Sequence, residues 1–287
     1  MVSGVNDATQ SPALRASTLA KSYGSKRALA GVDLEVGRAE LFGLLGPNGA
    51  GKSTLMKIAC GLVRPSMGAV EVLGTPAGSL AARSQIGYLA ELFRFPDWLT
   101  ADETLRLHQR LAGSEGGSPE RGEALELVAL SDARQTRVGS MSKGMQQRLG
   151  IAQALLGEPR LLMLDEPTSA LDPVGRRTVR DLLTELQGRG VAVILNSHLL
   201  SEIELVCDRV AIMRGGEIIR EGAPMELARP RGVEIETAAG KRVVEGAGRD
   251  DVPRIVSELV ADGERVYGAA VLASTLEDTY LEAVAGG

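Results

Sequence analysis

The sequence predicts an α/β protein with a parallel sheet, followed by a smaller α+β domain. One observation is a short apolar segment, Leu41–Leu45, that runs into a glycine-rich loop and then into a helical pattern. A second is a pair of apolar segments, Leu161–Leu164 and Val191–Leu195, typical of strands buried on both faces of a parallel sheet. The third is a change to a β-β-α-β-α pattern near the C-terminus. We therefore expect a large domain over residues 13–228 and a small one over 231–287.

The loop after the first apolar segment carries the pattern G-x-x-x-x-G-K-[ST], here Gly46-Pro47-Asn48-Gly49-Ala50-Gly51-Lys52-Ser53. Glycines let the backbone curl so that several N–H groups point at one anion, and the following helix adds its positive N-terminal end. Lys52 can then reach the β- and γ-phosphates of a nucleotide, and the Ser53 hydroxyl can ligate Mg²⁺. The alternative is a glycine-rich turn that happens to hold a lysine, and the helical pattern after it argues against this.

Further apolar segments predict strands on both sides of this loop. The predicted strands span Leu14–Thr18, Gly31–Val36, Ala69–Leu73 and Ile86–Leu89. A capping box at Thr100–Glu103 and the Ser-Pro pair at 118–119 each start a helix. We therefore expect a mostly helical insert over about residues 92–157. We also expect a disordered N-terminus over residues 1–12, because that segment is polar.

Aromatic residues gather at the start of the helical insert. The chain has one Trp, four Tyr and three Phe, and half of these eight residues are Tyr88, Phe93, Phe95 and Trp98. Aromatic side chains are enriched at interface hot spots, so we interpret Phe95 and Trp98 as partner contacts, with a local core as the alternative. His108 lies on the first predicted helix of the insert, and there we expect an ordinary packed or surface histidine.

Polar residues follow the buried strands at the point where each strand ends. Asp165 and Glu166 follow one apolar segment, and His198 follows the next along the chain. Ligands of open α/β sheets bind beyond the carboxyl ends of the strands. Two carboxylates there are costly without a cation or hydrogen bonds. If the three strands are neighbours in one parallel sheet, these side chains and the phosphate loop converge. Asp172 precedes Pro173 and could be no more than a helix N-cap.

The composition bounds the classes of function. The formal net charge is −5 and no block of Lys and Arg stands out, so no nucleic-acid surface is indicated. Cys60 and Cys207 lie far apart without metal spacing, and we interpret them as core residues of a protein in a reducing compartment. With two histidines in all, a histidine-rich metal site is excluded. No apolar run approaches the about 20 residues that cross a bilayer, so any membrane role would act through a partner.

With these segments in order, the chain resembles the ATPase subunit of an ABC transporter over most of its length, from about Leu14 to Ala228. The motifs that carry the resemblance are the Walker A loop Gly46–Ser53, the signature Met141-Ser142-Lys143-Gly144-Met145, the Walker B strand Leu161–Asp165 followed by Glu166, the D-loop Ser169–Asp172, the switch histidine His198 and the adenine-stacking aromatic Tyr23. The resemblance implies a P-loop NTPase of ABC ATPase type, with an antiparallel β subdomain, a RecA-like core and a helical subdomain. The small α+β C-terminal domain is appended to it. Two positions depart from the family pattern: the Q-loop glutamine is Glu91, and Lys143 stands where the signature has a glycine.

The resemblance also implies roles for single residues, with ATP and Mg²⁺ as the ligands. The residues that would bind the nucleotide are Tyr23, Gly46, Pro47, Asn48, Gly49, Ala50, Gly51, Lys52, Ser53, Thr54, Glu91, Ser142, Gly144, Asp165 and Asp172. Those that would hold Mg²⁺ are Ser53, Asp165 and Glu91. In catalysis, Lys52 would hold the β- and γ-phosphates and His198 would contact the γ-phosphate. Glu166 would act as general base on the attacking water.

The same resemblance implies partners. In this family two ATPase subunits pack head to tail, as a homodimer or a heterodimer, so Ser142 and Gly144 would serve the ATP held by the other subunit. The Ser-Lys-Gly-Met and Ile-Gly-Tyr-Leu segments look most like those of subunits serving ABC-2-type exporters, whose transmembrane permease is a separate chain. The region after Glu91 would form the groove that takes a coupling helix of the permease. We therefore expect a cytoplasmic protein held at the inner face of the cell membrane by a permease, with no nucleic acid.

Two other readings compete with this one. One is a soluble ABC ATPase of another class, such as a scaffold subunit for Fe–S cluster assembly or a nucleic-acid remodeller. The single phosphate loop and the short segment between Lys52 and Gly144 argue against the tandem-domain and coiled-coil classes of such ATPases. The other reading is an ATP-binding module that does not hydrolyse, against which Lys52, Asp165, Glu166 and His198 all stand. A neighbouring gene with about six hydrophobic spans would favour the transporter.

Overall fold

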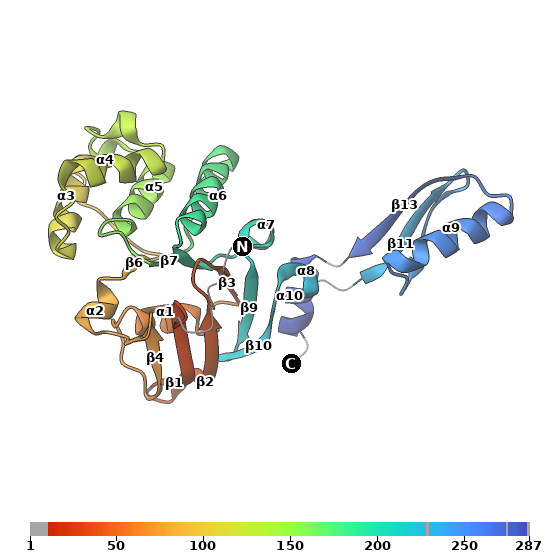
Figure 1. The fold of residues 1–287 in the computed structure, drawn as a ribbon, viewed down its shortest axis with the longest axis horizontal. Helices are drawn as coiled ribbons and strands as arrows, with labels where there is room; N and C mark the ends of the chain where they lie inside the picture. The colour runs from red at the N-terminus through yellow and green to blue at the C-terminus, as the bar shows by residue number, and fades with distance from the viewer. Residues whose placement is uncertain (1–10, 228–229, 274, 286–287) are drawn as a thin grey trace, which may run out of the picture. The chain divides into compact units, whose positions relative to one another are not determined.

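The computed structural model describes residues 11–227, 230–273 and 275–285. It divides into two compact units, Met1–Glu221 and Gly222–Gly287 (Figure 1). This division lies a few residues before the domain boundary expected at 228–231, and it groups α8 (Pro224–Leu227) with the second unit. The disorder expected at the N-terminus concerns mainly residues 1–10, which lie outside the described residues.

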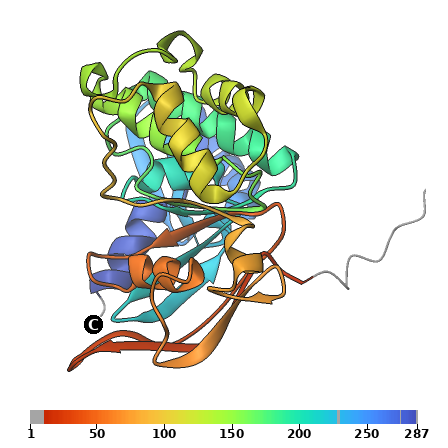
Figure 2. The same cartoon turned by 90° about the vertical axis from the view of Figure 1, so that its left-hand side faces the viewer.

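An antiparallel sheet in the order β2-β1-β4-β5 forms one side of the first unit (Figure 2). Its strands are β1 (Leu14–Tyr23), β2 (Lys26–Val36), β4 (Met67–Val72) and β5 (Thr75–Pro76). β1 continues five residues beyond the predicted end at Thr18, where the sequence suggested a turn. The reason is an irregularity after Ala16 that shifts the pairing register, with φ +43° at Thr18. A bulge of this kind breaks the alternation of side chains, so the second half of the strand lacks a recognisable pattern.

The central sheet has the order β10-β9-β3-β8-β7-β6, and its strands from β9 to β6 are parallel to their neighbours. Its strands are β3 (Leu41–Leu45), β6 (Ile86–Leu89), β7 (Leu161–Asp165), β8 (Ala192–Asn196), β9 (Arg209–Arg214) and β10 (Glu217–Gly222). β3, β8 and β7 are fully buried and lie side by side. This confirms that the three predicted apolar strands are neighbours in one parallel sheet.

Helices cover both faces of the central sheet. α1 (Lys52–Ala59) lies between the two sheets, where Leu55 and Met56 join the core of the first unit with Phe42 and Met163. On the opposite face, Gly43 lies against Ile203 of α7 (Leu200–Val206). α6 (Pro173–Gly188) precedes β8, and the short α2 (Leu80–Arg83) precedes β6. The mixture of an antiparallel sheet, a parallel sheet and helices is the predicted fold class.

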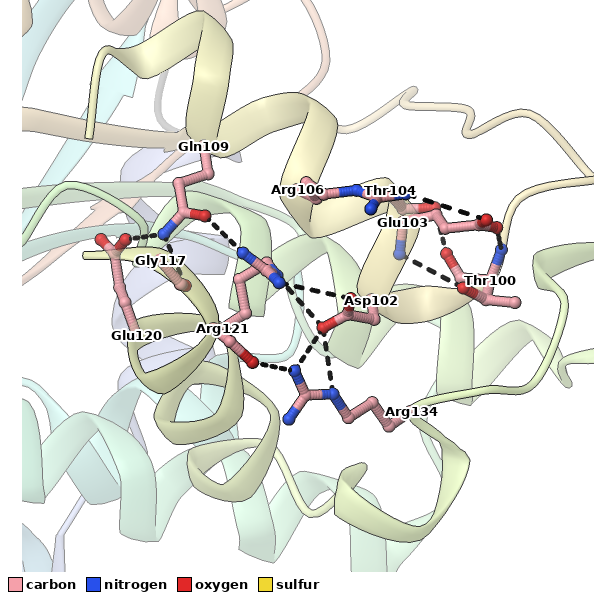
Figure 3. A network of polar contacts seen from close by, with 11 residues as sticks. Thr100, Asp102, Glu103, Thr104, Arg106, Gln109, Gly117, Glu120, Arg121 and Arg134 are labelled. Atoms are coloured by element: carbon pink, nitrogen blue, oxygen red, sulfur yellow. Dashed lines mark hydrogen bonds and ion pairs between the residues drawn. The ribbon is translucent and has the colours of Figure 1, made fainter. Parts of the chain in front are cut away.

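The helical insert follows β6 and is tied together by charged side chains (Figure 3). Its elements are α3 (Ala101–Ala112), α4 (Gly117–Leu127), η2 (Ser131–Ala133), η3 (Val138–Ser140) and α5 (Lys143–Ala154). The predicted capping box is present, because Thr100 and Glu103 exchange side chain–backbone hydrogen bonds. Asp102 of α3 accepts from Arg121 of α4 at 3.1 Å and from Arg134 at 2.6 Å. Arg121 also donates to Gln109 at 2.7 Å, so α3 and α4 are joined at two points.

The aromatic residues before α3 have two different environments. The rings of Phe93 and Phe95 lie 5.3 Å apart, and Phe95 meets His108 edge-on at 5.5 Å. These three partly buried side chains form a local cluster, so Phe95 has packing contacts within the chain and its contact with a partner stays a prediction. His108 is a packed histidine, one of the two ordinary environments that were expected for it. Trp98, by contrast, is 74% exposed. The cluster lowers the pKa of His108 through burial.

The second unit has the predicted β-β-α-β-α order after α8. Its elements are β11 (Pro230–Thr237), β12 (Gly240–Glu245), η4 (Arg249–Asp251), α9 (Val252–Ala261), β13 (Val266–Ala273) and α10 (Leu276–Ala285). The strands form an antiparallel sheet in the order β12-β11-β13, and Ile255 and Leu259 of α9 pack on its buried residues Val233 and Ile235. Across the part of the chain that the structure describes, no helix combines the length and the apolar character needed to cross a membrane.

Candidate active site

The glycine-rich loop lies between β3 and α1, and two of its glycines have conformations that other residues rarely adopt. Gly46 has φ +148°, and a Cβ there would lie 2.3 Å from the carbonyl oxygen of Met213. Gly51 has φ +111° and would meet the carbonyl oxygen of Ala28 at 2.6 Å. The loop is therefore curled tightly against β9 and β2, and only glycine permits both approaches.

Lys52 is buried at the start of α1, and its side chain folds back over the loop. Its Nζ donates to the carbonyl oxygen of Gly46 at 2.6 Å and to that of Pro47 at 3.2 Å. Burial lowers the pKa of Lys52, and the nearby carboxylates, that of Glu166 foremost, offset this only in part. The ammonium group of Lys52 is thus partly shielded from water, and there its attraction for an anion is stronger than in bulk solvent.

A pocket of about 520 Å³ opens beside this loop. Its lining residues are Tyr23, Lys26, Ala28, Asn48, Gly49, Ala50, Gly51, Lys52, Ser53, Thr54, Glu91, Glu166 and Asn196. Sequence analysis did not single out Lys26 or Asn196 for this site. Lys26 pairs with Tyr23 across the β1–β2 turn, and Asn196 pairs with Asp165 in the central sheet. Both would have required the strand register, which the sequence alone does not fix.

Asp165 ends β7 and is only 2% exposed. The side-chain amide of Asn196 donates to Oδ1 of Asp165, which holds the carboxylate at the carboxyl edge of the sheet. Two buried oxygens find no hydrogen-bond partner among the described residues: Oδ1 of Asn196, the strand partner of Asp165, and Oγ1 of Thr168, three residues after Asp165. Oxygen donors of this kind suit a hard cation such as Mg²⁺, which uses one or two protein carboxylates together with substrate phosphates. The Ser53 hydroxyl on the loop adds an oxygen of the same chemistry.

Glu166 follows Asp165 and has an unusual backbone, with φ +55° in a residue that is not glycine. Its N–H donates to the carbonyl oxygen of Asn196 at 2.8 Å, and its Oε2 lies 2.7 Å from Nδ1 of His198. Burial raises the pKa of Glu166, and the contact with His198 opposes this only in part. A carboxylate with a raised pKa, held by a histidine beside an anion-binding loop, is suited to accept a proton from water.

Tyr23 and Glu91 lie at the mouth of the pocket. The Tyr23 ring is 48% exposed, and Nζ of Lys21 lies 4.9 Å from its centre. Glu91 is exposed on the segment that follows β6. Both are therefore accessible to a bound molecule.

Seven of the expected site residues are not among those that line this pocket. Gly46, Pro47, Asp165 and His198 lie within two residues of lining residues along the chain, whereas Ser142, Gly144 and Asp172 lie elsewhere in the first unit. Ser142 is the N-cap of α5 and accepts from the N–H of Met145 at 3.1 Å. Asp172 is the N-cap of α6 and accepts from the N–H of Gly175 at 2.8 Å. Gly144 lies against Leu171, so the start of α5 packs on the segment before α6. Within one chain these residues have local structural roles, and their place in nucleotide binding stays a prediction.

Comparison with known proteins gives consistent matches. A family model described as ABC transporter matches residues 29–169. An ABC transporter ATP-binding protein of Bacillus subtilis is 43% identical over 231 residues, which cover 80% of this chain and 77% of the relative. Nod factor export ATP-binding protein I of Rhizobium etli is 37% identical over 238 residues, covering 82% of this chain and 73% of the relative.

Solved structures match this chain in the same way. The ATP-binding subunit of an ABC transporter is 30% identical with a TM-score of 0.68, covering 75% of this chain and 91% of that one. A dimeric ATP-binding cassette in a post-hydrolysis state, bound to ADP and phosphate, is 27% identical with a TM-score of 0.67. That match covers 73% of this chain and 98% of the cassette.

Proposed function

The chain belongs to the family of ABC transporter ATP-binding proteins and is an ATPase of that family, and from this premise we propose that it powers a separate membrane permease of the exporter type. The exporter assignment is supported by the relatives from Rhizobium etli and Rhizobium meliloti that are named as Nod factor export proteins, at 37% and 36% identity. The protein would work in the cytoplasm, held at the inner face of the membrane by that permease, and would bind no nucleic acid.

The observation that carries the hydrolytic role is the meeting of three strand ends at one edge of the central sheet. β3 runs into the phosphate loop, β7 into Asp165 and Glu166, and β8 into Asn196 and His198. The Glu166 carboxylate lines the same pocket as Lys52 and is hydrogen-bonded by His198.

We assign the residues of this edge to ATP as follows. The amides of the loop Gly46–Ser53 and the ammonium of Lys52 bind the phosphates, and Tyr23 stacks on the adenine. Ser53 and Asp165 hold Mg²⁺, with Glu91 at the rim. When bound, the metal neutralises charge on the phosphates of the nucleotide.

The chain's own part in the reaction is to hold the attacking water and to accept its proton. Glu166 accepts that proton on its carboxylate, and the contact with His198 fixes the direction of the carboxylate. When ATP binds, the ammonium group of Lys52 exchanges its hydrogen bonds to the carbonyl oxygens of Gly46 and Pro47 for hydrogen bonds to phosphate oxygens. The phosphate oxygens are the stronger acceptors because they are negatively charged. The partial burial of both groups strengthens these interactions.

A second copy of the chain, or a related subunit, would complete the site. Ser142 and Gly144 stand at the N-terminus of α5, and Asp172 stands at that of α6. A helix N-terminus is a favourable place for a phosphate, and the solved relative with ADP and phosphate is a dimer. We therefore propose a head-to-tail dimer in which these three residues face the nucleotide of the other subunit.

The test of this function is Glu166→Gln. The variant should bind MgATP with unchanged affinity, because the amide keeps the shape of the side chain. Its turnover should fall by about 10²–10⁴-fold, the typical contribution of a general base. It should also accumulate as an ATP-bound dimer, measured by gel filtration with ATP, and turnover near that of the unaltered chain would remove Glu166 from this role.

A further inference from the structure

The carbonyl group of Glu166 is held by a side chain of the helical insert. Its oxygen accepts a hydrogen bond from Nε2 of Gln147 at 3.0 Å and another from Oγ of Ser169 at 3.1 Å. Gln147 lies on α5, five residues after the N-cap Ser142, and is only 7% exposed. A hydrogen bond therefore connects α5, the helix that begins within the signature segment, with the residue proposed as the general base.

The backbone of Glu166 needs such a contact. Its φ of +55° lies in the left-handed region, which is strained for a residue other than glycine and persists only when its surroundings hold it. The N–H is fixed by Asn196 of β8, and the carbonyl is fixed by Gln147 and Ser169. Because the two peptide groups on either side set the direction of the Cα–Cβ bond, they also set where the carboxylate points.

Gln147 belongs to a part of the chain that is internally well connected. Nη1 of Arg148, the next residue on α5, donates to the carbonyl oxygens of Val128 and Ala129 at 2.8 Å each, which ties α5 to the end of α4. α4 is joined in turn to α3 by the Asp102 network (Figure 3). If the insert shifts, α5 therefore moves together with α3 and α4. Gln147 is the buried residue through which α5 contacts Glu166.

We propose that Gln147 is a positioning residue for hydrolysis, which holds the backbone of Glu166 in the geometry that aims its carboxylate and so makes the reaction depend on the placement of the helical insert. The inference rests on the proposed role of Glu166 as general base. Gln147 does not line the nucleotide pocket, so its effect is on the chemical step and not on the binding of ATP.

Two substitutions of Gln147 in the full chain test the proposal. Gln147→Met keeps the length of the side chain and removes the donor. Gln147→Glu keeps the shape and polarity but can only accept. We expect kcat to fall about tenfold in both, since misplacing a reacting group by 1 Å can cost up to about 10²-fold. KM and the equilibrium affinity for ATP should stay within about twofold of the unaltered chain.

Gln187→Met is the matched control. Gln187 also fixes a helix to the sheet through its amide, which donates to the carbonyl oxygen of Ala39 at 3.0 Å and to Asp208 at 2.7 Å. It lies near the end of α6, away from the carboxyl ends of the strands. Gln187→Met should leave kcat unchanged. Thermal melts of all variants identify loss of folding, and if Gln147→Met melts below the assay temperature, Gln147→Glu decides the question in the same assay.

Combining the substitutions separates this inference from the proposed function. In the Glu166→Gln background Gln147→Met should produce no further loss in single-turnover hydrolysis, because a group that acts through Glu166 has nothing left to position. A kcat in the Gln147 variants equal to that of Gln187→Met overturns the inference, as does the same tenfold loss in the Glu166→Gln background. Normal hydrolysis by Glu166→Gln alone instead overturns the base assignment itself.

Discussion

Tyr23 offers an aromatic ring to the pocket beside the phosphate loop. The ring lines that pocket and is half exposed, so it contributes little to the core of the first unit. The ammonium group of Lys21 lies near its centre, which fixes the ring without covering it fully. A half-exposed ring at a nucleotide pocket is available to stack on a base.

We therefore predict that Tyr23→Ala weakens ATP binding about tenfold, since stacking of a base on an aromatic side chain is worth about 1–3 kcal/mol. Tyr23→Phe should bind as the unaltered chain does, because the ring and not the hydroxyl makes the contact. Isothermal titration of the three proteins with ATP, beside a thermal melt of each, provides the measurement. Equal affinity in all three would show that the ring has only a structural role.

At the scale of single residues, the sequence predicts those site residues that a local motif or the end of a strand identifies. Lys52 and Ser53 are found from the loop pattern, and Asp165 is found from its place at the end of a buried strand. Gln147 and Asn196 could not be found in this way. Their contacts depend on how α5 and β8 lie against β7, and no spacing along the chain records that arrangement.

At the scale of elements, the predicted strands and helices agree best with the structure where periodicity is regular. The apolar runs of β3, β7 and β8 and the capping box of α3 are placed correctly within a residue or two. The second half of β1 was missed because of its irregular register, and β5 is too short to leave a pattern. Local signals therefore predict an element's existence more reliably than its ends.

Asp102 joins three parts of the helical insert through charged hydrogen bonds. It is largely buried and accepts hydrogen bonds from Arg121 and Arg134, which come from different elements (Figure 3). We predict that Asp102→Asn lowers the free energy of unfolding by about 2–3 kcal/mol at pH 7, because it leaves two arginines without their counter-charge. Urea unfolding of the full chain measures this.

The loss should depend on pH in one direction. Partial burial raises the pKa of Asp102, but the hydrogen bonds from Arg121 and Arg134 outweigh it and hold the pKa below its ordinary value of 3.8. The stability that the carboxylate contributes is therefore fully present above pH 3.8 and is lost as the pH falls through the lower folded-state pKa. The difference between Asp102→Asn and the unaltered chain should shrink over that range.

Asp181→Asn is the control for this prediction. Asp181 lies 3.9 Å from Arg177 on α6, and both side chains are exposed. Exposed pairs are worth about 0–1 kcal/mol, so the control should change stability little at any pH. If Asp102→Asn were no more destabilising than Asp181→Asn, the network would have no special part in holding the insert.

At the scale of the whole molecule, the proposed function needs other chains. The pocket beside the phosphate loop is lined by elements of the first unit, while Ser142, Gly144 and Asp172 lie elsewhere on it. In the proposed function, the chain acts on a membrane through a permease. The surface that meets this partner is therefore as much a part of its function as the pocket.

Trp98 is the best candidate for that surface. It lies between β6 and α3 on a segment whose backbone is well fixed: Gly139 N–H donates to the carbonyl oxygen of Asp97 at 3.0 Å, and Val138 N–H donates to that of Leu99 at 2.8 Å. The segment is thus held on both sides of a side chain that is itself 74% exposed. An exposed tryptophan on an ordered backbone is ready for binding at little cost in conformational entropy. It also lies seven residues after Glu91, at the rim of the nucleotide pocket.

We predict that Trp98→Ala leaves the free chain folded, with unchanged melting temperature and ATP affinity, but weakens its assembly with the permease. Truncating an aromatic hot spot typically costs at least about 2 kcal/mol of binding, so the affinity for the permease should fall about 30-fold or more. Co-purification of the two proteins from detergent-solubilised membranes measures this.

Met67→Ala is the control, since Met67 is also exposed, at 71%, but lies on β4 of the antiparallel sheet. If Trp98→Ala unfolds the free chain, Trp98 is part of the core. If the complex assembles as it does with Met67→Ala, the permease binds at another surface, because truncating an exposed ring that contacts no partner leaves the binding free energy unchanged.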